Sequence, residues 1–228
     1  EVKYIESRMD ATGDHPVSWT GSVIPMPLHH SDAIISLGEG DTRCVELPAT
    51  GKQLGLQTLY AKLEFLNPTG SFKDRGSVVM VSVAKEHGVK ELVEDSSGNA
   101  GASVSAYAAR AGIKAHIFTP ASAPLPKLNQ ITAYGAEVHS IEGSRENATA
   151  EALAYVEKRR LVYASHAMSP YYFEGTKTFA YEIVEWFAER KLPDHILFPV
   201  GNGSLLIGTW IGLRELRDAG QIIDIPRL

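Results

Sequence analysis

Cysteine is nearly absent from the sequence. Cys44 is the only cysteine among 228 residues, which excludes an internal disulfide and a structural zinc site built from several thiolates. The eight histidines are dispersed, so we expect His29, His30, His116 and His166 to be structural or surface residues rather than metal ligands. We therefore predict no metal site, and the scarcity of cysteine favours a cytoplasmic protein.

Basic tracts and long apolar runs are also lacking. The formal net charge is −5 and the pI is about 5.9, and lysines and arginines are interleaved with acids, so no nucleic-acid partner is expected. Residues 1–8 contain no apolar signal core, and the apolar runs are interrupted well before the length of a membrane span. No membrane partner is expected either.

The signatures of several common enzyme classes are missing as well. There is no G-x-S-x-G nucleophile elbow, no H-E-x-x-H helix and no G-x-x-x-x-G-K-[ST] phosphate loop. The chemistry must be sought in other patterns.

What is present is an alternation of short β-rich runs with longer helical patterns from Thr58 onward, after an irregular arm that reaches to about Gly40. The candidate strands are residues 58–64, 91–94, 115–119, 137–141, 162–164 and 196–200. The candidate helices, in which apolar residues recur three and four apart, are residues 75–86, 100–111, 125–134, 146–159, 175–189 and 205–216. Several end at a glycine suited to a left-handed cap, namely Gly88, Gly112, Gly135 and Gly220.

This alternation predicts an α/β fold. Strands that alternate with helices need crossover connections, so the sheets are expected to be mostly parallel and flanked by helices. Ligands of such folds bind beyond the carboxyl ends of the strands. Three loops that follow candidate strands are therefore of interest.

The first loop leads into a helix near Lys73. Thr69, Gly70 and Ser71 provide turn and capping chemistry, and Lys73 lies at or near the first helical turn. The positive end of the helix dipole and partial burial both favour loss of the ammonium proton, which a Schiff-base amine requires. By spacing alone, a solvated surface lysine is the alternative.

Two glycine- and serine-rich loops complete the set. Residues 95–103 hold small residues whose backbone N–H groups can approach an anion, together with the amide of Asn99; an ordinary helix start is the alternative. Residues 200–204 join an apolar strand to a helix and form a nest of N–H donors suited to a phosphate, although a tight turn without ligand is possible. The spacing of the glycines is not that of a dinucleotide fingerprint.

The order and spacing of these loops resemble those of the fold-type II pyridoxal-phosphate enzymes, a group that includes the tryptophan synthase β chain, and most closely the threonine synthases. The segment NPTGSFKDRG at residues 67–76 resembles the cofactor-lysine motif of threonine synthases, whereas dehydratases usually carry an aliphatic residue at the position of Asp74. The segments SLGEGDT (36–42), SSGNAG (96–101), EGTKT (174–178) and PVGNGS (199–204) are also similar to family segments.

The resemblance implies pyridoxal 5'-phosphate as cofactor and a role for each loop. Lys73 would form the Schiff base, and its freed amine would remove the α-proton of an amino-acid substrate before β or γ elimination or replacement. The other expected cofactor contacts are Phe72, Asn99 at the ring hydroxyl, and Val200, Gly201, Asn202, Gly203 and Ser204 around the phosphate. The expected substrate contacts are Ser96, Ser97, Gly98, Ala100 and Tyr172.

Two departures from the family pattern leave alternatives open. Tyr172 stands where threonine synthases usually carry the arginine that grips the substrate phosphate, and a phenol cannot replace that contact. A threonine or serine ammonia-lyase, or a non-catalytic cofactor-binding paralogue, is therefore the alternative to a threonine synthase. The chain also stops soon after the helix of the phosphate loop, so we expect that the C-terminal part of the fold is missing.

The resemblance further implies two domains and, by the habit of the family, a homodimer. We predict a large cofactor domain of residues 1–75 and 165–228, and a small movable domain of residues 76–164 that closes over the substrate.

Overall fold

The computed structural model describes residues 18–19, 22–24 and 26–228. Part of the predicted irregular arm and of the first domain segment, namely residues 1–17, 20–21 and 25, lies outside the described residues. Within the arm, β1 (Ser18–Trp19) pairs with β2 (Ser22–Val23), and a short 3-10 helix, η1, spans Ser31–Ala33.

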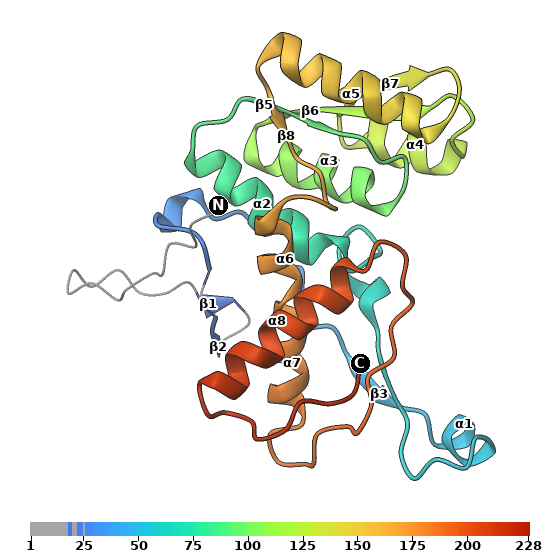
Figure 1. Cartoon of the computed structure of the whole chain (residues 1–228), viewed down its shortest axis with the longest axis vertical. Helices are drawn as coiled ribbons and strands as arrows, with labels where there is room; N and C mark the ends of the chain where they lie inside the picture. Colours follow the sequence, from blue (N-terminus) through green and yellow to red (C-terminus); the bar gives the residue numbers. More distant parts are fainter. Residues whose placement is uncertain (1–17, 20–21, 25) are drawn as a thin grey trace.

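The upper part of Figure 1 is a four-stranded parallel sheet with helices on both faces. Its strands lie in the order β7 (Glu137–Ile141), β6 (Lys114–Pro120), β5 (Glu91–Glu94) and β8 (Val162–Tyr163). The helices are α3 (Asn99–Ala111), α4 (Leu125–Ala133) and α5 (Arg145–Arg159). The predicted α/β class and parallel sheet are confirmed.

The order in which the strands are added to this parallel sheet reverses on the two sides of β5. It runs outward from β5 to β6 and β7, and then returns through α5 to add β8 on the other side of β5. Loops that leave two such neighbouring strands in opposite directions open a crevice at the carboxyl ends. The ends of β5 and β8 are therefore where this topology favours a ligand.

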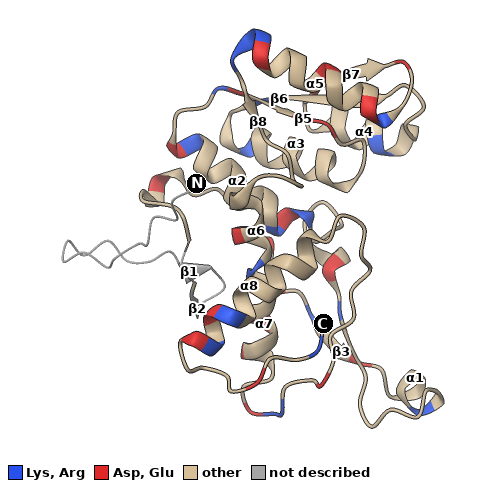
Figure 2. Cartoon of the chain, in the orientation of Figure 1, with Lys and Arg blue, Asp and Glu red and all other residues tan. Residues whose placement is uncertain are grey.

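The lower part of the molecule is built largely of helices. It contains α6 (Pro170–Thr176), α7 (Thr178–Trp186) and α8 (Ser204–Asp218), with a small antiparallel pair of β3 (Cys44–Glu46) and β4 (Tyr60–Lys62) beside them. The remaining short elements are α1 (Pro48–Gln53) and the 3-10 helix η2 (Glu64–Leu66). Figure 2 shows acidic and basic residues interspersed in both parts.

Helix α2 (Lys73–Glu86) connects the two parts. Every residue of α2 from Asp74 to Ala84 is buried, because α3 packs against it from the upper part and α6 from the lower part. A helix that is buried all round carries small and apolar side chains on every face, as this one does from Gly76 to Ala84. The predicted domain boundary at residue 75 falls within this helix, and the domain division and its movement stay predictions.

Close packing of α6 on α2 depends on a glycine of the EGTKT segment. A Cβ at Gly175 would lie 2.0 Å from the carbonyl oxygen of Arg75, so only glycine permits this approach. The contact aligns the start of α2 with the lower part, and Lys73 is the first residue of α2.

Two sequence predictions about the elements need correction. The predicted helix 175–189 is two helices, α6 and α7, which meet at Lys177. The hydroxyls of Thr176 and Thr178 donate to the carbonyls of Phe173 and Gly175, and such hydrogen bonds bend helices.

The helical caps at Gly88, Gly112, Gly135 and Gly220 all have positive φ, as expected.

The predicted strand 196–200 is wrong. Within the described residues, the only pairing of this segment is a single bridge between His195 and Arg227, where Ile196 N donates to Arg227 O over 2.8 Å. An extended segment becomes a strand only when a neighbour accepts its backbone hydrogen bonds. The side chains of Leu197 and Val200 are accordingly exposed, by 87% and 60%.

Candidate active site

A cavity of about 260 Å³ lies between the start of α2 and the loop before α8. This volume is slightly below the roughly 300–1,000 Å³ that is typical of small-molecule sites. The cavity is lined by Phe72, Lys73, Arg145, His166 and residues 198–206. It therefore brings together the lysine loop and the glycine loop, which are separated by more than a hundred residues in the sequence.

The amine of Lys73 is prepared for nucleophilic chemistry. Burial lowers the pKa of Lys73 from 10.5 to about 8, although the nearby carboxylate of Glu94 raises it. Its Nζ lies 3.7 Å from the centre of the Phe72 ring and makes no hydrogen bond or ion pair to any described residue. An amine that is partly desolvated and free of a carboxylate partner is available for reaction with a carbonyl group.

The two residues after Lys73 hold the helix start in place. The buried carboxylate of Asp74 accepts hydrogen bonds from the backbone N–H of Thr69 (2.7 Å) and from the Ser103 hydroxyl of α3 (2.6 Å). Burial raises the pKa of Asp74, and the hydrogen bonds from Ser103 and Thr69 oppose that rise. Asp74 thus ties the lysine loop to the upper part of the molecule.

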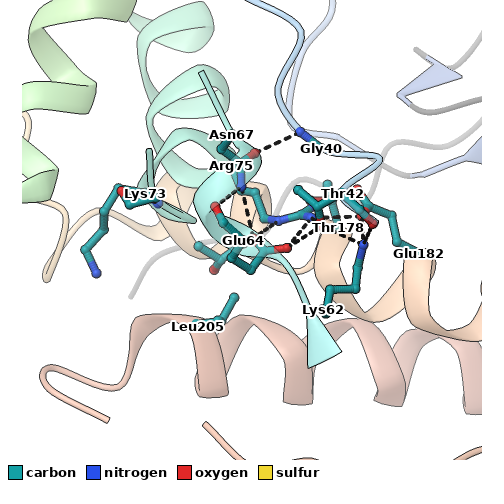
Figure 3. Close-up of polar contacts among 12 residues, drawn as sticks. Gly40, Thr42, Lys62, Glu64, Asn67, Lys73, Arg75, Thr178, Glu182 and Leu205 are labelled. Atoms are coloured by element: carbon teal, nitrogen blue, oxygen red, sulfur yellow. Dashed lines mark hydrogen bonds and ion pairs between the residues drawn. The ribbon is translucent and has the colours of Figure 1, made fainter. Parts of the chain in front are cut away.

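Arg75 ties the same loop to the lower part. Its guanidinium is 1% exposed and pairs with Glu64 (2.7 and 2.8 Å) and with Glu182 of α7 (2.6 and 2.8 Å). Lys62 adds a second ion pair to Glu182 at 2.6 Å. Figure 3 shows this cluster on one side of α2, whereas the Lys73 side chain points to the other side, away from it.

The glycine loop has the geometry of an anion site. Gly203 has a φ of +80°, a left-handed conformation that favours glycine, and it caps the N-terminus of the 15-residue helix α8. The Asn202 side chain accepts hydrogen bonds from the backbone N–H and the hydroxyl of Ser204, at 3.2 and 3.1 Å. The first N–H groups of α8 have no partner within the helix and lie at the positive end of its dipole. Such a terminus suits a phosphate.

Two further residues of the cavity region belong to the crevice between β5 and β8. Glu94, the last residue of β5, is fully buried, and its Oε1 lies 2.7 Å from Nδ1 of His166, which follows β8. Burial raises the pKa of Glu94, and the hydrogen bond from His166 opposes that rise. The pair holds the imidazole at the wall of the cavity that contains Lys73.

The sequence did not single out Glu94 or Arg145, and it treated His166 as a structural residue. Arg145, the first residue of α5, is exposed and lines the cavity from the upper part. No motif marks these residues, because they are brought to the lysine by strand order rather than by spacing along the chain. The only available signal was that Glu94 ends a candidate strand.

The predicted substrate contacts of residues 96–98 and Ala100, and the predicted cofactor contact Asn99, lie apart from the cavity lining. Ser96 is buried, Ser97 and Gly98 are half-buried, and Asn99 is exposed at the start of α3. Their loop follows β5 directly and therefore lies at the same carboxyl edge of the sheet as Glu94, the last residue of that strand. The roles proposed for Asn99 and for residues 96–98 and Ala100 stay predictions.

Tyr172 occupies a different place from the one that its motif position implied. Its ring is fully buried beneath α2, where a Cβ at Gly76 would lie 2.5 Å from it, and its hydroxyl donates to the carbonyl of Lys73 over 3.2 Å. This geometry supports a role in holding the backbone of Lys73. It disfavours the predicted substrate contact, which stays a prediction.

Comparison with protein-family models gives a match over most of the chain. A family model described as "Pyridoxal-phosphate dependent enzyme" matches residues 35–225. The chain belongs to this family, whose fold-type II members share the architecture seen here.

Among curated relatives, the similar proteins include threonine synthases. The chain is 37% identical to the threonine synthase of Methanocaldococcus jannaschii over 204 residues, covering 89% of this chain and 50% of that protein. It is 41% identical to that of Bacillus sp. over 191 residues, covering 83% and 53%. The chain spans about half the length of the curated relatives it matches.

The solved structures that resemble the chain include enzymes with other names. A pyridoxal 5'-phosphate-dependent aspartate racemase matches with a TM-score of 0.71 at 27% identity, covering 78% of this chain and 54% of that one. A serine racemase from Dictyostelium discoideum matches with a TM-score of 0.69 at 29% identity, covering 78% and 57%. The fold therefore does not distinguish among reactions of this family.

The residues of the cavity fit pyridoxal phosphate. The cavity offers the amine of Lys73 with its lowered pKa, the aromatic ring of Phe72 beside it, and a glycine loop at a helix N-terminus. These features suit a ring that carries an aldehyde and a phosphate, because the amine can react with the aldehyde and the helix N-terminus can bind the phosphate. No helix in the described part of the chain is both long and apolar enough to cross a membrane.

Proposed function

We propose that the chain carries the cofactor-binding part of a pyridoxal-phosphate enzyme of the threonine synthase type, which acts on an amino acid by α-proton removal and β or γ elimination or replacement. The observation that supports the proposal is that Lys73 and residues 200–204 line one cavity. Lys73 would hold the cofactor covalently, and Gly201, Asn202, Gly203 and Ser204 would hold its phosphate. When bound, the cofactor supplies an electron sink for the substrate carbanion.

The protein's own residues perform positioning and proton transfer. Burial keeps a fraction of the free Lys73 amine neutral near pH 7, and once a substrate has released it from the cofactor this amine would accept the α-proton of the substrate. Tyr172 and Asp74 fix the backbone from which this amine projects. His166, oriented by Glu94, is a second group at the cavity wall that can donate or accept a proton.

The position of Arg145 favours the hypothesis that the substrate carries a phosphate group. It is the arginine that lines the described cavity, and a guanidinium binds phosphate through two parallel hydrogen bonds. We propose that Arg145 supplies the contact for which Tyr172 is unsuited. Phosphohomoserine then remains the leading substrate of the proposal, with an ammonia-lyase acting on threonine or serine as the second candidate.

Reconstitution with the cofactor tests the proposal. The purified chain mixed with pyridoxal phosphate should develop a visible absorption band that the Lys73→Ala variant lacks. Borohydride reduction should then leave the cofactor mass on the peptide that contains Lys73. The matched control is Lys191→Ala, because Lys191 is exposed and Asp194, at 2.7 Å, is its one ion-pair partner among the described residues. A colourless mixture, or labelling equal in Lys73→Ala, would refute the proposal.

Steady-state assays of the loaded protein separate the candidate substrates. If Arg145 binds a substrate phosphate, Arg145→Gln should raise KM for phosphohomoserine by at least about tenfold and leave KM for threonine within about twofold. Turnover of threonine or serine alone, with no effect of the substitution, would favour the ammonia-lyase.

A further inference from the structure

Two histidines and two carboxylates gather on the neighbouring strands β5, β6 and β7. Glu91 is the first residue of β5, His116 belongs to β6, and Glu137 and His139 belong to β7. Glu91 and Glu137 begin their strands and His116 and His139 are each the third residue of theirs, whereas Glu94 is the last residue of β5; none of the four lines the cavity that contains Lys73. The cluster is therefore separate from the active site.

The potential ligand atoms have the separations that one metal ion requires. His116 Nδ1 lies 3.1 Å from His139 Nε2, and the carboxylate oxygens of Glu137 lie 3.7 Å from the former and 3.5 Å from the latter. An ion bound tetrahedrally at ~2.0 Å places neighbouring ligand atoms ~3.3 Å apart. The three separations bracket this value, so a single ion can contact all three side chains after small adjustments.

Glu91 prepares His116 for this role. Its Oε2 lies 2.9 Å from His116 Nε2, on the side of the ring away from His139, and Arg159 holds the carboxylate at 3.2 Å. When the Nε2–H group donates a hydrogen bond to Glu91, Nδ1 carries no proton and presents a lone pair toward His139 and Glu137. A carboxylate behind a histidine is the usual outer partner of a metal ligand.

Packing fixes the two imidazole rings. The His139 ring stacks on Phe118 with centroids 4.3 Å apart and planes at 8°, and the Tyr155 ring lies 5.3 Å from it. His116 is 1% exposed. Rings that are already held in place lose little conformational freedom when they bind an ion.

The only opposing feature among the described contacts is Lys114. Its amine pairs with Glu137 at 2.7 Å, but both side chains are about half exposed, at 52% and 47%. An ion pair that is open to solvent contributes little, so Lys114 can give way. The exposure of Glu137 also leaves room for water as the fourth ligand.

We propose that His116, Glu137 and His139 form a binding site for a divalent ion of the zinc class, which joins the edge strand β7 to β6. Two imidazoles and one carboxylate select Zn²⁺, Co²⁺ or Ni²⁺ over the oxygen-seeking Mg²⁺ and Ca²⁺. The proposal reverses the expectation that the histidines, His116 among them, serve only structural or surface roles. The site tethers the sheet edge and takes no part in the amino-acid chemistry.

Metal titration of the full chain tests the site. After chelator treatment and dialysis, calorimetric titration with Zn²⁺ should show one ion per chain, and Co²⁺ should give the visible spectrum of a four-coordinate ion. His139→Ala and Glu137→Gln should each weaken Zn²⁺ binding by at least about tenfold. Glu91→Gln should weaken it by roughly 10–100-fold, because the outer partner would be lost.

The control variant is His195→Ala, which removes an exposed histidine outside the cluster. It should bind Zn²⁺ as the parent does. Circular dichroism of Glu137→Gln, a change at a half-exposed side chain, checks that the fold is retained. The proposal is overturned if the parent binds no Zn²⁺, or if the affinity is unchanged in both His139→Ala and Glu137→Gln.

Discussion

The reactivity of Lys73 should follow pH with a midpoint of about 8, because burial lowers its pKa from 10.5 to that value. At pH 7 this shift makes the neutral fraction of the amine roughly 300-fold larger than that of a free lysine. A large part of the nucleophilic character of the site would then come from desolvation by the surrounding protein rather than from a dedicated base.

The perturbation that tests this reasoning is Glu94→Gln. The Glu94 carboxylate raises the pKa of Lys73, so its removal should move the midpoint further below 8. Phe72→Ala should have the opposite effect, because opening the cavity wall beside Nζ hydrates the ammonium and moves the pKa back toward 10.5.

The assay is the rate of acylation of the Lys73 peptide as a function of pH, followed by mass spectrometry on the cofactor-free chain. The same peptide in urea supplies the reference, with a midpoint near the ordinary 10.5. A folded profile that coincides with the urea profile would refute the desolvation argument. A midpoint that rises in Glu94→Gln would refute the assigned sign of the Glu94 interaction.

Three further predictions concern stability in urea unfolding. Gly175→Ala should cost about 1–3 kcal/mol or more, because its Cβ would lie 2.0 Å from the Arg75 carbonyl, whereas Gly201→Ala, with no atom within 4 Å, should stay within about 0.5 kcal/mol. Glu182→Ala should cost about 3–5 kcal/mol, because the buried Arg75 keeps only Glu64 as a carboxylate partner among the described residues and Lys62 loses its ion pair. Burial raises the pKa of Glu182, but Arg75 and Lys62 outweigh it and lower the pKa from 4.5 to about 2, so this contribution is present above pH 4.5 and lost as pH falls toward 2. Lys73→Met should be more stable than the parent below pH 8, and the difference should shrink between pH 8 and 10.5, where the unfolded parent binds more protons than the folded one. A stability difference that is independent of pH, an unaffected Gly175→Ala, or equal acid sensitivity with and without Glu182 would contradict the respective argument.

Most elements of the fold were predictable from local pattern. The strands of the upper sheet and the four glycine-capped helix ends follow from side-chain periodicity and from the conformational freedom of glycine, which act over a few residues. The segment 196–200 was not predictable in this way. Its composition favours a strand, but a strand forms only where a neighbour pairs with it, and the described residues offer a single bridge at His195.

By itself, the sequence determined the family, the cofactor lysine as a hypothesis, and the loops beside it, because Lys73 and the glycine loop carry their chemistry in short contiguous motifs. The tertiary structure alone decided which side chains share the cavity. The reversal of strand order between β5 and β8 brings Glu94 to His166, and the packing of α6 on α2 buries Tyr172 beneath the lysine. These contacts join residues that are 72 and 99 positions apart. No local sequence pattern encodes contacts between residues so far apart in the chain, because these contacts depend on how whole helices and strands pack.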